Sequence, residues 1–92
     1  MTVKWISGLD PLHHKMYVAF GYHRTTAKLR KETWHLTWPQ WRDAWLPVWD
    51  QRGRGRDCLC MARIHMMGDW CLNNIEIITR QEHGRRVREF YT

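Results

Sequence analysis

The sequence predicts an α+β fold in which two N-terminal helices, within residues 11–50, pack on a C-terminal unit of two strands and a helix, within residues 58–91. Two observations predict it. Apolar side chains recur at helical spacing in the first half of the chain, and two short apolar runs precede a final helical pattern in the second half. Ninety-two residues allow one domain, so we expect both parts to share one core.

The first helix is expected from Pro11 to about Lys31. Asp10 is a favoured N-cap, and a proline suits the first turn because its missing N–H would have no helical partner there. The residues that then recur at helical spacing are Leu12, Met16, Ala19, Phe20, His23 and Ala27.

A second helix is expected from about Trp38 to Trp49, where Thr37 and Gln40 form a capping box and Pro47 kinks or shortens the last turn. Its tryptophans lie on one face. Such a stripe is either core, since each ring buries about 150–250 Å², or a stacking platform for unpaired bases. We favour core, because a small domain needs this buried area.

Two strands joined by a turn follow in the second half of the chain. Cys58–His65 is a compact apolar run, and Ile75–Ile78 is β-branched with one polar break, which is the composition of a half-buried strand. Met66–Asp69 supplies the turn, in which Gly68 is free to take φ > 0.

The last helix is expected from about Arg80 to Phe90. Thr79 is its expected N-cap, and Glu82, three residues later, completes a second capping box. Strand, turn, strand and helix together form a compact ββα unit.

Fifteen basic residues against nine acidic ones give a net charge of +6. This balance suits a polyanionic partner, nucleic acid first, or an acidic protein surface. No apolar run approaches the roughly 20 residues of a membrane span, and Met1–Asp10 lacks the pattern of a signal peptide. We therefore expect a cytoplasmic protein with no membrane partner.

Three cysteines cannot all pair, so Cys58, Cys60 and Cys71 are interpreted as reduced, semi-buried thiols. A zinc site that combines them with His65 or His83 is an alternative, although C-x-C is not a usual structural-zinc spacing. We expect no cofactor.

The segment Cys58–Tyr91 resembles the ββα core of small HNH-type proteins common in phages, and Thr33–Gln51 is loosely similar. A Trp-bearing helix followed by an Arg-Gly-rich loop, Trp41 to Gly55, is also similar to that group. The matching positions in the ββα segment are Arg63, Ile64, Gly68, Trp70 in the place of a tyrosine, Asn74, Thr79 and Glu82.

The catalytic positions depart from that family. An HNH nuclease needs a metal ligand, a histidine base, an asparagine that orients the base and a helical histidine, because the metal stabilises phosphate charge while the base activates water. In register, the ligand position is Ala62 and the base position is Arg63, and neither side chain can do this chemistry. Asn74 is kept, and His83 lies near the helical ligand position. The alternative is a metal-dependent nicking endonuclease with a shifted site of His65, Asn74 and His83.

Arginines are the candidate binding residues. In the loop Gln51–Asp57 three of them alternate with two glycines, and such a loop either binds phosphate, through guanidinium forks and close backbone amides, or is merely flexible and solvated. The resemblance implies that this loop, Arg63 and the last helix converge on one basic surface. The candidates for nucleic-acid or partner binding are Arg52, Arg54, Arg56, Arg63, Arg80, Arg85, Arg86 and Arg88.

We therefore expect a non-catalytic HNH-like protein that binds nucleic acid, or a host protein complex that handles nucleic acid. The resemblance and the small size imply a phage-encoded inhibitor of host defence or host machinery, including the anti-CRISPR type, acting in the host cytoplasm. Besides the nicking endonuclease, the alternative is a purely protein-binding inhibitor module, since tryptophan and arginine dominate interface hot spots. The identity of the partner and the oligomeric state stay open.

Overall fold

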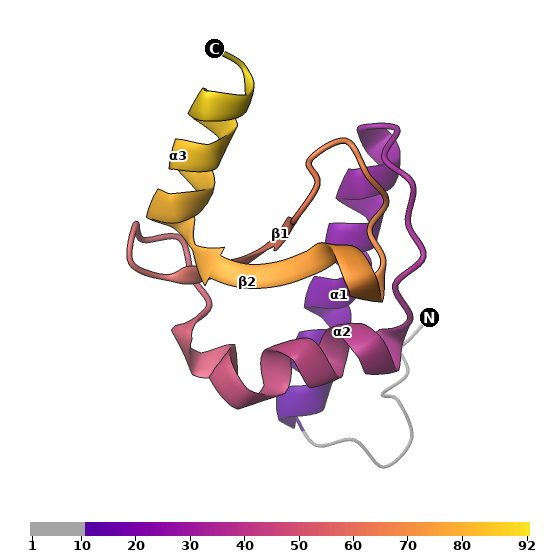
Figure 1. Cartoon of the computed structure of the whole chain (residues 1–92). Coiled ribbons are helices and arrows are strands. Elements are labelled where there is room, and N and C mark those ends of the chain that lie inside the picture. Colours follow the sequence, from indigo (N-terminus) through magenta and orange to yellow (C-terminus); the bar gives the residue numbers. More distant parts are fainter. Residues whose placement is uncertain (1–10) are drawn as a thin grey trace.

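The computed structural model describes residues 11–92 and confirms the α+β class (Figure 1). Helices α1 (Pro11–Leu29) and α2 (Trp38–Trp45) pack against each other. Strands β1 (Leu59–Arg63) and β2 (Ile75–Thr79) form an antiparallel hairpin. Figure 1 shows helix α3, which directly follows β2, rising from one end of the hairpin.

Helix α1 ends in a Schellman motif, slightly before the expected Lys31. The Glu32 N–H donates to the Ala27 carbonyl (2.9 Å), and the Lys31 N–H donates to the Lys28 carbonyl (3.0 Å). Lys31 takes φ 62°, a left-handed conformation that usually falls to glycine at this position. The turn directs the chain, and with it Glu32, toward the hairpin. The predicted N-cap Asp10 lies outside the described residues.

The capping box of α2 is confirmed, because Thr37 Oγ1 accepts from the Gln40 N–H (3.3 Å) and Gln40 Oε1 accepts from the Thr37 N–H (3.1 Å). The α-helix stops at Trp45, and the 3₁₀ helix η1 (Leu46–Gln51) carries the chain onward. The α-helix is thus shorter than the expected Trp38–Trp49, and the distortion expected at Pro47 takes the form of a change to 3₁₀ geometry.

Tryptophans form the centre of the core. Trp41 and Trp45 are 0% and 1% exposed, and their ring centroids lie 6.1 Å apart. Trp38 and Trp49, from the same face, are partly buried against them. The core interpretation of this stripe is thus confirmed for its inner rings. The other buried members are Met16, Phe20, Ala27, Leu36, Met61 and Trp70.

The hairpin register pairs Leu59 with Thr79 and Arg63 with Ile75. Strand β1 is shorter than predicted, because it ends at Arg63 and leaves His65 in the loop of residues 64–74, which closes with the 3₁₀ helix η2 (Leu72–Asn74). The prediction that the first strand extends to His65 is therefore wrong, and His65 does not continue the strand face of Arg63.

The hairpin loop is fixed to the connection between α1 and α2. The His35 N–H donates to the Trp70 carbonyl, and the Trp70 N–H donates to the Thr33 carbonyl, both at 2.8 Å. These bonds hold the hairpin against the helical half. Within residues 11–92, no helix is long and apolar enough to cross a membrane.

Candidate nucleic-acid interface

A hollow of about 460 Å³ is lined by residues of α1, β1 and α3, together with residues of α2 and of the loops. Figure 1 shows α3 rising from the end of the hairpin. Helix α3 contributes residues spaced for one helical face: Arg80, His83, Val87 and Tyr91. Helix α1 contributes Tyr22 and His23 among others. The hollow therefore lies where the helical half meets the ββα-like unit.

Four arginines and one carboxylate line this hollow. The carboxylate is that of Glu32, and both of its oxygens are occupied: Oε2 pairs with Arg63 Nη2 (3.1 Å), and Oε1 accepts from Trp70 Nε1 (3.0 Å). The other three guanidiniums, those of Arg30, Arg52 and Arg80, form no ion pair with any residue of the described chain. The hollow consequently carries an excess of positive charge.

Arg52 and Arg80 are close enough to affect each other. The Arg52 guanidinium lies over the rings of Trp45 (5.6 Å) and Trp49 (5.2 Å), a cation–π arrangement that fixes its position. Partial burial, and then the charge of Arg80, hold the pKa of Arg52 below its usual value. Two like charges side by side repel, so an anion between them would be favourable.

The loop that carries Arg52 is anchored on the first turn of α3. The Arg80 N–H donates to the Cys58 carbonyl (2.9 Å), and the Gln81 N–H donates to the Arg56 carbonyl (3.0 Å). The Arg80 side chain also donates to the Gly53 carbonyl. A Cβ at Gly53 would lie 2.8 Å from Cys58 Sγ, so a larger residue here would displace the Cys58 side chain. The first N–H groups of α3, which have no partner within the helix, thus donate to carbonyls of the loop.

Both histidines of the hollow have lowered pKa values. His23 Nδ1 accepts from Trp41 Nε1 (3.1 Å), and its ring centroid lies 4.5 Å from that of Trp70. Burial, and next the charge of Arg52, lower the pKa of His23 to about 4. Burial, followed by the charges of nearby arginines, also lowers the pKa of His83. Near neutral pH the positive charge of the hollow thus comes from guanidinium groups alone.

This lowered pKa predicts a pH dependence of stability. Because the unfolded chain protonates His23 near its usual pKa of 6.5 and the folded chain only near 4, stability is complete above pH 6.5 and falls as the pH drops toward 4. Urea denaturation should show a loss of about 2 kcal/mol between pH 7 and pH 5. His23→Gln, which keeps an acceptor for Trp41, should remove most of this loss; an unchanged pH profile would contradict the prediction.

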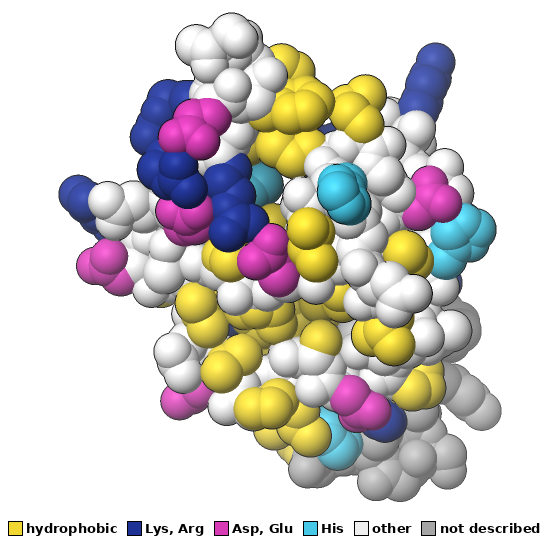
Figure 2. All heavy atoms as spheres, viewed as in Figure 1, with side chains coloured by type: hydrophobic (Ala, Val, Ile, Leu, Met, Phe, Trp, Pro, Cys, Tyr) yellow, Lys and Arg dark blue, Asp and Glu magenta, His cyan; other side chains and the backbone are white. Residues whose placement is uncertain are grey.

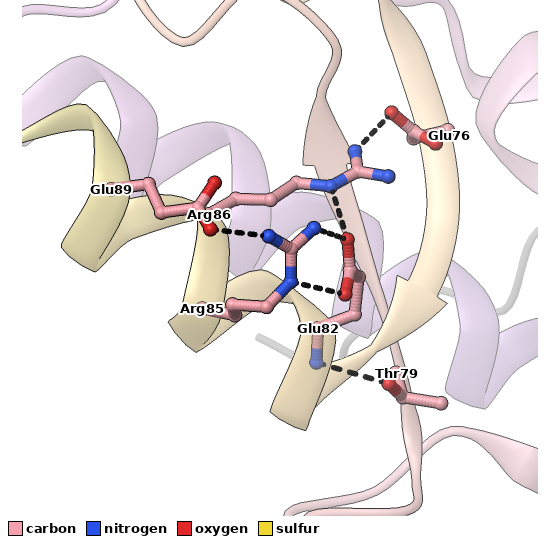
Figure 3. A network of polar contacts seen from close by, with 6 residues as sticks. All are labelled: Glu76, Thr79, Glu82, Arg85, Arg86 and Glu89. Carbon is pink, nitrogen blue, oxygen red and sulfur yellow. Dashed lines mark hydrogen bonds and ion pairs between the residues drawn. The ribbon is translucent and has the colours of Figure 1, made fainter.

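The outer face of α3 holds a different set of arginines, which Figure 3 shows in an ion-pair network. Arg85 pairs with Glu82 and Glu89, and Arg86 pairs with Glu82 and, on β2, with Glu76. Hydrogen bonds from both arginines lower the pKa of Glu82 to about 2. Figure 2 shows the resulting mosaic of basic and acidic side chains over α3. These two predicted binding residues are therefore charge-compensated.

The capping box predicted for α3 is only half formed. Thr79 Oγ1 accepts from the Glu82 N–H (3.1 Å). The Glu82 carboxylate, however, is engaged by Arg85 and Arg86 rather than by the Thr79 N–H. Two guanidiniums outcompete one backbone amide, since hydrogen bonds between charged groups are stronger.

The remaining predicted arginines are exposed. Arg54 and Lys15 line a second hollow that shares Arg52 and Tyr22 with the first. Arg56 and Arg88 form no ion pair within residues 11–92. The structure thus brings Arg52, Arg63 and Arg80 together, with Arg54 beside them, and places Arg85 and Arg86 on the outer face of α3.

Ala62, at the expected metal-ligand position, is buried, and Asn74 of the nuclease alternative makes structural hydrogen bonds. Ala62 is 2% exposed within the hairpin. Asn74 Oδ1 accepts from the His65 N–H (2.8 Å), and its Nδ2 donates to the carbonyls of His65 (3.2 Å) and Asp69 (2.9 Å). A Cβ at Gly68 would lie 2.8 Å from this Nδ2. Close approach thus requires this glycine, whose φ lies outside the left-handed range.

No group of three or more His, Cys, Asp or Glu side chains in residues 11–92 is placed to hold a metal ion. The three cysteines are free thiols, and burial raises the pKa of Cys60. Only His83 of the alternative catalytic set lines the cationic hollow.

Asn74→Ala should lower the free energy of unfolding by about 1–3 kcal/mol, because it removes three hydrogen bonds that the buried Asn74 side chain makes to the backbone of the hairpin loop. The neighbouring Asn73 is exposed, so Asn73→Ala is the matched control and should cost less than about 0.5 kcal/mol. Thermal and urea denaturation measure both. Equal effects of the two substitutions would mean that the asparagine does not brace the loop.

Several residues of the hollow are absent from the sequence-based candidates: Tyr22, His23, Arg30 and Tyr91. Arg30 lies in a run of basic residues that helix-dipole stabilisation explains equally well, so the sequence offers no signal that separates it. No protein-family model, curated protein or solved structure matches this chain.

Proposed function

We propose that this protein binds nucleic acid without cutting it, using the hollow between α1 and α3 and the adjacent cations of Lys15 and Arg54, here called the basic rim. One observation supports this above others: Arg30, Arg52 and Arg80 line one hollow without a carboxylate partner in the described chain. Guanidinium groups bind phosphate through paired N–H donors, and a chain with a net charge of +6 attracts polyanions over a distance.

We further propose that the ββα unit is HNH-like and lacks the catalytic groups of a nuclease. The buried methyl group of Ala62 and the ion pair of Arg63 with Glu32 support this part. In this proposal the protein is a phage-encoded inhibitor of host machinery that handles nucleic acid. Its basis is the resemblance of Cys58–Tyr91 to small phage HNH-type proteins, together with the size of the chain.

A second candidate is a purely protein-binding inhibitor module. A separate observation favours it: three apolar side chains of the hairpin loop, those of Ile64, Met67 and Leu72, are exposed. Contiguous exposed apolar surface is typical of protein interfaces, and this loop would supply the apolar part of one.

Salt-dependent binding distinguishes these two functions. Labelled single-stranded and duplex oligonucleotides are titrated at several salt concentrations, and log Kobs should fall with log salt at about −0.7 to −0.9 per phosphate contact. Glu32→Gln should strengthen binding, because it removes the carboxylate charge of the hollow and keeps an acceptor for Trp70. A flat salt dependence would favour the protein-binding module.

The absence of cleavage has its own test. Supercoiled plasmid incubated with the protein and Mg²⁺, Mn²⁺ or Ni²⁺ should stay supercoiled. Nicking that His83→Ala abolishes would establish the endonuclease alternative and refute the proposal.

A further inference from the structure

We infer that the hollow takes one unpaired nucleotide of a single strand, with its phosphate beside Arg52 and Arg80. This inference rests on the proposed function and narrows it from nucleic acid in general to single-stranded nucleic acid. Four features of the described residues carry it: the size of the hollow, its two exposed tyrosines, its fixed guanidiniums and the basic hollow next to it.

The size suits a small ligand rather than a duplex. A volume of about 460 Å³ falls within the range of roughly 300–1,000 Å³ that small-molecule sites occupy. A base inside a duplex is paired and stacked, so it reaches such a site only after it has left the helix. An unpaired base has already left the stack and enters without that cost.

The two tyrosines offer surfaces for a base. Tyr22 on α1 and Tyr91 after α3 both line the hollow, and each is 73% exposed. Tyr22 belongs to α1, and Tyr91 directly follows the last residue of α3. Exposed aromatic rings beside a basic groove are the common element of single-strand binding, because every base has a face that can stack.

The two guanidiniums are held in place before any ligand arrives. Arg80 donates to the Gly53 carbonyl, and Arg52 rests on the rings of Trp45 and Trp49. A phosphate between them would replace their mutual repulsion by attraction. Because these side chains are already ordered, less conformational entropy is lost on binding.

The second hollow provides a path for the rest of the strand. It shares Ala19, Tyr22 and Arg52 with the first and adds the cations of Lys15 and Arg54. A phosphate adjacent to the bound nucleotide would meet these two cations. The basic rim therefore follows a chain of phosphates rather than a single isolated ion.

The test compares three ligands of equal length by fluorescence polarisation: oligothymidylate, an abasic strand with the same phosphates, and a duplex. Oligothymidylate should bind at least about fivefold more tightly than the abasic strand, because only it can stack on the tyrosines. The double substitution Tyr22→Ala/Tyr91→Ala should remove this difference. Tyr22→Phe/Tyr91→Phe, which keeps both rings, should retain it, and circular dichroism of all variants verifies that they fold.

The outcomes separate the inference from the proposed function. If the abasic strand or the duplex binds as tightly as oligothymidylate, the inference is wrong, while nucleic-acid binding through the backbone stands. If none of the three ligands binds, both fail.

Discussion

Trp41→Ala is expected to lower the free energy of unfolding by about 3–5 kcal/mol, as large-to-small substitutions at buried tryptophan do. Trp41 is 0% exposed, contacts the Trp45 ring and donates its indole N–H to His23. Natural domains are stable by only about 5–15 kcal/mol, so this variant should lose a large fraction of its free energy of unfolding. Urea denaturation followed by far-UV circular dichroism measures the change.

Leu29→Ala is the control for this prediction, because Leu29 is 79% exposed at the end of α1. Its expected cost is within about 0.5 kcal/mol. A loss below about 1 kcal/mol for Trp41→Ala would contradict a core built on this tryptophan stripe.

Arg52→Gln/Arg80→Gln is expected to weaken binding of a single-stranded oligonucleotide by about 30-fold or more at low salt. Hydrogen bonds to charged groups contribute about 1.5–3 kcal/mol each, and two are removed. The slope of log Kobs against log salt should become shallower by about one to two. Fluorescence polarisation over a range of salt concentrations gives both quantities.

Lys28→Gln/Lys31→Gln removes the same charge from exposed positions around the end of α1, outside the lining of the hollow. This control should change affinity less than threefold. Equal losses in the two double variants would mean that net charge, and not the hollow, accounts for binding.

Local sequence signals predicted most of the fold. Three features act only on residues next to them in the chain, and the structure contains what each predicts. The β-branched run Ile75–Ile78 lies in a strand, Thr37 and Gln40 form a capping box, and the helix is distorted at Pro47. The left-handed conformation of Lys31 was not predictable in this way, because glycine usually occupies this position at the end of a helix.

The candidate site was predictable only in part. The arginines of the loop stand out by their spacing. Whether a guanidinium forms an ion pair, however, depends on which acidic residues the fold places next to it. Glu82 lies three and four residues before Arg85 and Arg86, so that pairing was readable from the sequence. The pairing of Arg63 with Glu32 joins residues 31 apart and has no local signal.

NMR of ¹⁵N-labelled protein tests most directly whether the ligand binds the arginines without a carboxylate partner or those in the ion-pair network of α3. Arginine Nε–Hε resonances are followed while single-stranded oligothymidylate is added. Those of Arg52 and Arg80 should shift with saturation, and those of Arg85 and Arg86 should stay in place. Shifts confined to Arg85 and Arg86, or spread equally over all four, would contradict binding in the hollow between α1 and α3.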